Sequence, residues 1–115
     1  MKLTEQKSRL IEAGATPLGS KEAETFALQV PAWSLREKEL RREFRFKDFR
    51  QAMEFTNKVA AIANEQDHHP DISISYNKVT LVLTTHKIGG LSMNDFIVAA
   101  RIDLMAGAER SERAA

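Results

Sequence analysis

The three histidines of this chain are the residues best suited to chemistry, and they occur close together. His68 and His69 are adjacent, and His86 follows near the other end of the segment DHHPDISISYNKVTLVLTTHK. Imidazole has an unperturbed pKa of about 6.5, nearer to neutrality than any other side chain, so one ring can donate a proton while another accepts one. A cluster of such rings would suit general acid–base catalysis on a small molecule.

The residues between the histidines predict a β-hairpin that brings them together. Apolar and polar residues alternate on both sides of a two-residue turn expected at Asn77 and Lys78. Continued outward, this register places His69 opposite His86 on the polar face, with His68 just before the strand. We therefore expect three imidazoles at one end of one hairpin. The predicted cross-strand pairs are Tyr76 with Val79, Ile74 with Leu81 and Ile72 with Leu83.

Two other interpretations of the histidine cluster stay open. The histidines can be surface or cap residues without chemistry, or they can form a three-histidine metal site. Because His68 and His69 are adjacent, their side chains would point to opposite faces of a strand. The sequence also has no His-x-x-x-His pair that a helix could present to one ion. The metal site is therefore the least favoured of the three interpretations.

The N-terminal part of the chain predicts two short helices. The first spans Leu3–Ala13 and ends at Gly14. After a loop, Ser20 is suited to cap a second helix that runs to about Gln29, where Val30–Pro31 stops it.

A first hairpin and a long helix follow in the sequence. Polar and apolar residues alternate on both sides of a charged turn between Arg36 and Glu39. The apolar positions of this hairpin are Trp33, Leu35, Leu40, Phe44 and Phe46. Asp48 is suited to cap the long helix, whose apolar residues recur at helical spacing. These residues are Phe49, Ala52, Met53, Thr56, Val59, Ala60 and Ala63, with Phe55 and Ile62 beside them.

The last predicted helix begins at Ser92, after a break at Gly89–Gly90. Ser92 and Asp95 have the spacing of a capping box. The order of strand pair, helix, strand pair and helix predicts an α+β domain, with a four-stranded antiparallel sheet and helices packed on one face. The predicted buried face of the last helix is Met93, Phe96, Ile97, Ala100 and Leu104.

Composition and charge narrow the class of protein. The chain has 115 residues, which suits one domain, with 43% hydrophobic and 29% charged residues. A net charge of +1 gives no electrostatic case for direct nucleic-acid or membrane binding. The sequence has no cysteine, no secretion signal and no membrane-spanning apolar run, so we expect a cytoplasmic protein. We divide it into an N-terminal extension at 1–19, a domain at 20–108 and a polar tail at 109–115.

Taken in order, these motifs resemble the pterin-4a-carbinolamine dehydratase family, which in animals also acts as a dimerisation cofactor of a homeodomain transcription factor. The resemblance covers Ser20 to Met105. The segments VPAWSL, FRFKDFRQAMEF and TTHKIGGLSMND are similar to the family's first strand, its strand-to-helix entry and its Thr-His segment. The family pattern of His-His-Pro, an aromatic residue, a further histidine and an aspartate is matched here by His68-His69-Pro70, Tyr76, His86 and Asp95.

The resemblance implies an activity. These enzymes dehydrate a 4a-hydroxytetrahydropterin to the quinonoid dihydropterin, so that the pterin can be reduced and reused by aromatic amino acid hydroxylases. They use no metal and no organic cofactor. By analogy, acid–base roles fall on His68 and His86, and an orienting role falls on His69.

The same resemblance suggests which residues surround the pterin. Tyr76 and Asp95 are interpreted as structural, since one would pack the hairpin and the other would cap a helix. Trp33 suits an apolar wall of the site or, equally, the ordinary core. The residues expected to contact the pterin are Glu65, Asp67, Pro70, Thr84, Thr85, Lys87 and Trp33.

One position departs from the family pattern. The family has a charged residue, often Glu, four positions before the first histidine, and here that position is Asn64, with Glu65 beside it. If the long helix continues to His68, Glu65 lies on the histidine's side of the helix and can take that role. If the helix ends sooner, the Glu65 carboxylate points elsewhere.

A second hypothesis is a non-catalytic dimerising module that binds other proteins. The resemblance implies an even-numbered homo-oligomer, a dimer or a tetramer, and an open sheet edge suits self-association. A pure scaffold has no need of three imidazoles on a polar strand face, which favours the enzyme.

Overall fold

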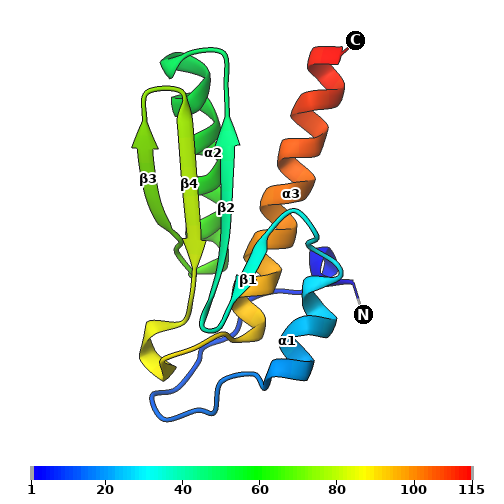
Figure 1. Ribbon diagram of the computed structural model, residues 1–115, viewed down its shortest axis with the longest axis vertical. Helices are drawn as coiled ribbons and strands as arrows, with labels where there is room; N and C mark the ends of the chain where they lie inside the picture. Colours follow the sequence, from blue (N-terminus) through cyan, green and yellow to red (C-terminus); the bar gives the residue numbers. More distant parts are fainter. Residues whose placement is uncertain (1, 115) are drawn as a thin grey trace.

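The fold consists of one antiparallel sheet covered on one face by two long helices (Figure 1). The computed structural model describes residues 2–114, and of residues 108–114 it describes the backbone alone. The elements in chain order are η1 (Leu3–Glu5), α1 (Ser20–Ala27), β1 (Ser34–Arg36), β2 (Glu39–Arg45), α2 (Phe49–Gln66), β3 (Asp71–Ser75), β4 (Lys78–Leu83), η2 (His86–Ile88) and α3 (Met93–Ala114). The strands lie in the order β1-β2-β4-β3. The predicted α+β class, sheet and helix arrangement are confirmed.

The core lies between the sheet and the helices, as the alternating pattern predicts. Leu40 and Phe44 of β2 are buried, and so are all three apolar residues predicted on β4. The Phe44 and Phe55 rings lie 4.5 Å apart between their centroids, which joins β2 to α2. Each large side chain buried here contributes about 1.5–3 kcal/mol to stability. The largest fully buried apolar side chains are Leu3, Val30, Leu40, Phe55, Val59, Val79, Leu81, Leu83, Phe96, Val98 and Ile102.

Helix α2 begins as predicted, because the Asp48 carboxylate accepts a hydrogen bond of 2.9 Å from the Gln51 N–H. It ends at Gln66, and Asp67 follows in the left-handed conformation with φ of 50°. The helix therefore stops before the first histidine. The predicted apolar stripe is buried at its centre, but Phe49 at its start is 49% exposed.

The second hairpin forms, but its predicted register is wrong by two residues. The observed pairs are Ile74 with Val79 and Ile72 with Leu81, and the turn lies at Tyr76 and Asn77. Asn77 fixes this turn, because its backbone carbonyl and its side-chain amide both bind the backbone of Phe46, beyond the end of β2. A shift of two residues keeps each side chain on its face.

The shifted register changes the expected neighbours of the turn and of the histidines. Tyr76 does not pack the hairpin but lies in the turn, 65% exposed. Ile72 and Ile74 point to the predicted face, yet each is 38% exposed because β3 is the edge strand. If the observed pairing is continued past Asp71, His69 lies opposite Thr84 rather than opposite His86.

The N-terminal segment is not the predicted helix. Only η1 is helical in the range 3–13, and the chain after it crosses α3 towards η2 before it reaches α1 (Figure 1). The N-cap position of α1 is Gly19 rather than the predicted Ser20, so no side chain caps this helix. The helix predicted from Leu3 to Ala13 fails because the segment's backbone is bound by side chains of other elements instead of by itself.

Helix α3 starts as predicted and continues through the polar tail. The Asp95 carboxylate accepts a 2.9 Å hydrogen bond from the Ser92 N–H, which is the return bond of a capping box. The backbone is helical to Ala114, while the side chains of the tail and residue 115 itself lie outside the described residues. Leu104, predicted to be buried, is 64% exposed.

Across residues 2–114, no helix has both the length and the apolar character needed to cross a membrane.

The turn of the second hairpin yields a prediction about stability. Tyr76 has φ of 52°, a conformation that costs an aromatic residue about 1–2 kcal/mol and costs glycine little. We expect Tyr76→Gly to raise the free energy of unfolding by about 0.5–1 kcal/mol in urea denaturation, after the greater entropy of unfolded glycine is subtracted. Tyr76→Ala keeps the left-handed cost and is the control. Equal effects of the two substitutions would contradict this explanation.

Candidate active site

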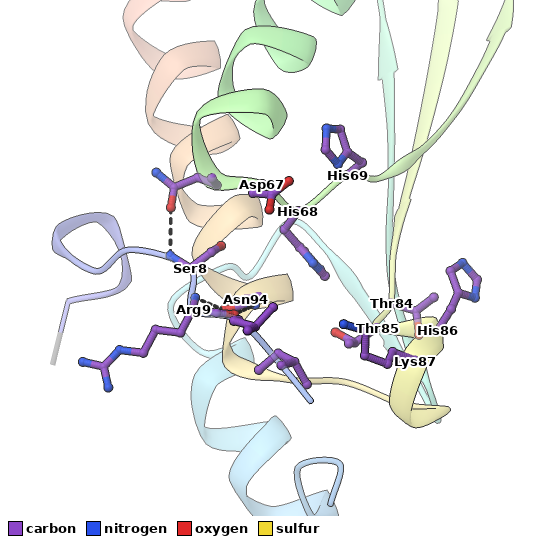
Figure 2. A pocket seen from close by; sticks show the side chains of 13 residues that line it. Ser8, Arg9, Asp67, His68, His69, Thr84, Thr85, His86, Lys87 and Asn94 are labelled. Atoms are coloured by element: carbon purple, nitrogen blue, oxygen red, sulfur yellow. Dashed lines mark hydrogen bonds between the residues drawn. The ribbon is translucent and has the colours of Figure 1, made fainter. Parts of the chain in front are cut away.

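All three histidines line one cavity of about 470 Å³. Figure 2 shows the ring of His68 between Ser8 and Arg9 on one side and Thr84–Lys87 on the other. The predicted gathering of the imidazoles at one end of the β3–β4 hairpin is therefore confirmed. The lining residues are Ser8, Arg9, Leu10, Ile11, Gln66, Asp67, His68, His69, Thr84, Thr85, His86, Lys87 and Asn94.

His68 is held by a buried carboxylate. Its Nε2 lies 2.6 Å from Oδ1 of Asp95, and the Asp95 side chain is fully buried. The other carboxylate oxygen accepts from the Ser92 N–H at 2.9 Å and from the Thr85 hydroxyl at 2.8 Å. In the neutral ring this arrangement keeps the proton on Nε2 and leaves the lone pair on Nδ1. Asp95 is thus a helix cap, as predicted, and also the partner of His68, which the sequence interpretation missed.

His69 and His86 lie at the rim of the cavity. The Nε2 of His69 forms a 2.9 Å hydrogen bond with Oδ1 of Asn64, and Figure 2 shows its ring turned away from that of His68. The side chain of His86 is 78% exposed, and its Nε2 lies 3.7 Å from a carboxylate oxygen of Asp71 on β3. One ring is therefore fixed from within the molecule, and two are open to solvent.

The backbone on the helix side of the cavity is set by the end of α2. After the left-handed Asp67, the His68 N–H still donates to the Ala63 carbonyl at 3.1 Å. This bond holds His68 against the last turn of α2 although the helix has ended. Its side chain can then reach Asp95 at the start of α3.

The loop that carries His86 is closed by a short bridge. Thr85 and Gly90 pair across it, with the Thr85 N–H donating to the Gly90 carbonyl at 3.0 Å. Gly89 has φ of 67°, which glycine adopts without cost. A Cβ at Gly90 would lie 2.8 Å from the Cβ of Pro17, so the loop packs closely against the N-terminal segment.

Most of the predicted site residues lie at the cavity. Besides the histidines, Asp67, Thr84, Thr85 and Lys87 line it. The Thr85 hydroxyl is occupied by Asp95 and by Ser92, and that of Thr84 by the Lys38 carbonyl.

Three predicted residues are not among those lining the cavity. Trp33 lies in the core, 4% exposed, where its indole N–H donates to Asp103 at 2.7 Å. Pro70 is buried where the chain enters β3. Glu65 faces Arg101 at 3.7 Å, because α2 ends before it could present this carboxylate to His68. Asn64 instead forms a hydrogen bond with His69, the second histidine of the pair.

The sequence interpretation missed one whole wall of the cavity. Ser8–Ile11 line it, together with Gln66 and Asn94. The bonds that fix this wall join residues far apart in the chain, so no local pattern reveals them.

Among the side chains that the structure describes, those of residues 2–107, no group of three or more histidine, aspartate or glutamate residues is arranged to hold a metal ion.

The chain is similar to pterin dehydratases in sequence and in fold. A protein of Nitrosomonas eutropha, whose name gives it provisionally as a pterin-4-alpha-carbinolamine dehydratase, is 42% identical over 104 residues, which are 90% of this chain and 92% of that protein. A protein of Nitrosospira multiformis with the same provisional name is 44% identical over 103 residues, 90% of this chain and 91% of its own.

A solved structure gives the same result. The crystal structure of a transcriptional coactivator/pterin dehydratase from Brucella melitensis matches with a TM-score of 0.75 at 30% identity, and the match covers 80% of this chain and 100% of that one. Residues 16–105 fit the family model described as Pterin 4 alpha carbinolamine dehydratase. The chain therefore belongs to the pterin 4 alpha carbinolamine dehydratase family.

Proposed function

We propose that this protein dehydrates a 4a-hydroxytetrahydropterin to the quinonoid dihydropterin by histidine acid–base catalysis. The observation that carries the proposal is the His68–Asp95 pair, 2.6 Å apart, in a cavity that two further histidines also line. Membership of the family supports the dehydratase activity, and the cavity supplies the groups that the reaction needs.

The reaction moves two protons. The hydroxyl on C4a must gain a proton to leave as water, and a ring nitrogen must lose one, so that the product is a neutral quinonoid ring. His68 and His86 divide these tasks in our proposal, and His69 orients the ring system. A histidine held by a buried carboxylate is a suitable proton carrier, because the carboxylate fixes which nitrogen carries the proton and stabilises the charged ring.

The polar edge of the pterin has groups that match the rest of the cavity. The pterin ring carries N–H groups that can donate hydrogen bonds to the exposed carboxylate of Asp67. It also carries a carbonyl oxygen that can accept a hydrogen bond from the ammonium of Lys87. We propose that these two side chains bind the substrate. The reaction itself would return the pterin to a form that can be reduced and reused by an aromatic amino acid hydroxylase, in the cytoplasm.

We also propose that the protein forms an even-numbered homo-oligomer. β3 is an edge strand of the sheet, and it exposes Ile72 and Ile74 at 38% each. An unpaired edge with apolar side chains supports self-association. The same edge is what favours the second candidate function, a dimerising module that binds other proteins, and the related Brucella melitensis protein carries the name of a transcriptional coactivator as well as of a dehydratase.

Substitution of His68 tests the catalytic proposal. We expect His68→Gln to lower kcat at least about 100-fold, the usual size of an acid–base contribution, because an amide can still donate to Asp95 but cannot exchange protons near neutrality. Turnover is measured by absorbance with enzymatically generated 4a-carbinolamine, and thermal unfolding checks that the fold persists. Wild-type turnover in His68→Gln would sink the proposal, and an inactive wild-type protein would favour the dimerising module.

Substitution of Asp95 tests its role as the residue that positions His68. We expect Asp95→Asn to lower kcat at least about tenfold, because a neutral amide no longer fixes the ring or stabilises its charge. Nitrogen NMR of the histidine side chains should show the neutral His68 ring with its proton on Nε2 in the wild type and a mixture of tautomers in the variant. Thr85→Val removes another donor to Asp95 and controls for lost stability. If the tautomer signal is unchanged in Asp95→Asn, Asp95 has no positioning role.

A paired comparison of Asn64 and Glu65 tests which residue stands in for the missing charged one. Because Asn64 contacts His69 and Glu65 faces Arg101, we expect Asn64→Ala to lower kcat/KM by about three- to tenfold, as expected for one lost hydrogen bond. Glu65→Ala should stay within about twofold of the wild type, since its exposed ion pair contributes little. The reverse order would restore the role first expected of Glu65.

A further inference from the structure

The N-terminal strap, which we define as residues 6–11, is fixed to the body of the protein through its backbone. The Ser8 N–H donates to Oε1 of Gln66 at 2.9 Å. The Arg9 N–H donates to Oδ1 of Asn94 at 2.9 Å, and the Arg9 carbonyl accepts from Nδ2 of the same side chain at 2.6 Å. Asn94 thus binds the strap much as a neighbouring β-strand would.

The two side chains that hold the strap are buried and adjacent to the candidate catalytic pair. Gln66 and Asn94 are each 5% exposed. Gln66 ends α2, just before the segment that carries His68, and Asn94 directly precedes Asp95. A buried amide that loses its partners is costly, so both side chains favour the docked strap. The position of the strap is therefore fixed relative to His68.

Two side chains of the strap lack, within the protein, the contacts that their chemistry favours. The Ser8 hydroxyl oxygen is buried and has no hydrogen-bond partner among the described residues. Leu10 is 83% exposed, although it is a large apolar residue. Both residues line the cavity that the histidines share, and Figure 2 shows Ser8 on its wall. One wall therefore carries a hydroxyl without a hydrogen-bond partner and an exposed apolar side chain. A flat heterocyclic ligand with a polar edge could supply the missing hydrogen bond and cover the apolar side chain.

We infer that the strap is part of the substrate site, with the Ser8 hydroxyl hydrogen-bonding the polar edge of the bicyclic ring and Leu10 packing against its face. The inference rests on the proposed function for the identity of the ligand. Both residues precede residue 16, where the match to the family model begins. Their role is to bind the substrate, because the proton transfers are assigned to the histidines on the other walls.

The test is to measure KM and kcat separately in variants that leave the core and the strap backbone unchanged, because a lost binding contact raises KM without lowering kcat. We expect Ser8→Ala and Leu10→Ala each to raise KM for the 4a-carbinolamine by about three- to tenfold, the effect of one lost contact, with kcat within about twofold of the wild type. The matched control is Leu28→Ala, since Leu28 is 79% exposed at the end of α1 and is not among the residues lining the cavity. It should leave both constants unchanged.

A binding measurement separates this inference from the proposed function. Fluorescence titration with 7,8-dihydropterin, which is not turned over, should give a Kd that rises by the same factor in Ser8→Ala and Leu10→Ala. If the wild type is active and neither KM nor Kd changes, the strap has no role in binding and the dehydratase stands. If the wild type binds dihydropterin without turnover and both variants weaken binding, the strap's role stands and the dehydratase fails. If the wild type does not bind the pterin at all, both are overturned.

Discussion

The buried carboxylate of Asp95 is the group on which the rest of the site depends. A carboxylate without solvent is costly unless every oxygen has partners, and here the partners come from three separate segments. The Ser92 N–H lies just before α3, the Thr85 hydroxyl lies in the loop after β4, and His68 follows α2. The need to satisfy one charge therefore brings together the parts of the chain that form the cavity, and His68, for which we propose an acid–base role, is one of the groups that satisfies it.

The layers of the fold follow from patterns that are local in the sequence. Alternation predicts the buried face of β4, and helical spacing with Asp48 as a cap predicts the start of α2. The hairpin register was not predictable in this way, because Asn77 is held in the turn by the backbone of Phe46, which lies beyond the end of another strand. The faces of the strands were still correct, since an even shift preserves them.

The histidine side of the site was predictable, and the opposite wall was not. The spacing of three histidines about one hairpin suffices to place them at one end of it, whatever the register. The strap depends on side-chain amides that bind backbone groups far away in sequence, and Gln66 and Asn94 have no pattern that marks them for this task. Glu65 was misplaced for a smaller reason: one left-handed residue, Asp67, ends the helix and changes which side chains face the cavity.

The contact between Gly90 and Pro17 has a consequence for natural variation in this protein. Gly90 bears no functional group, but any larger residue there would push the loop of His86 away from the segment that leads out of the strap. A substitution that adds a single methyl group at Gly90 would therefore move two walls of one cavity apart. An inherited change of this kind would resemble the loss of an essential reactive residue, although the only thing lost would be the space in which the Gly90 backbone packs against the Pro17 ring.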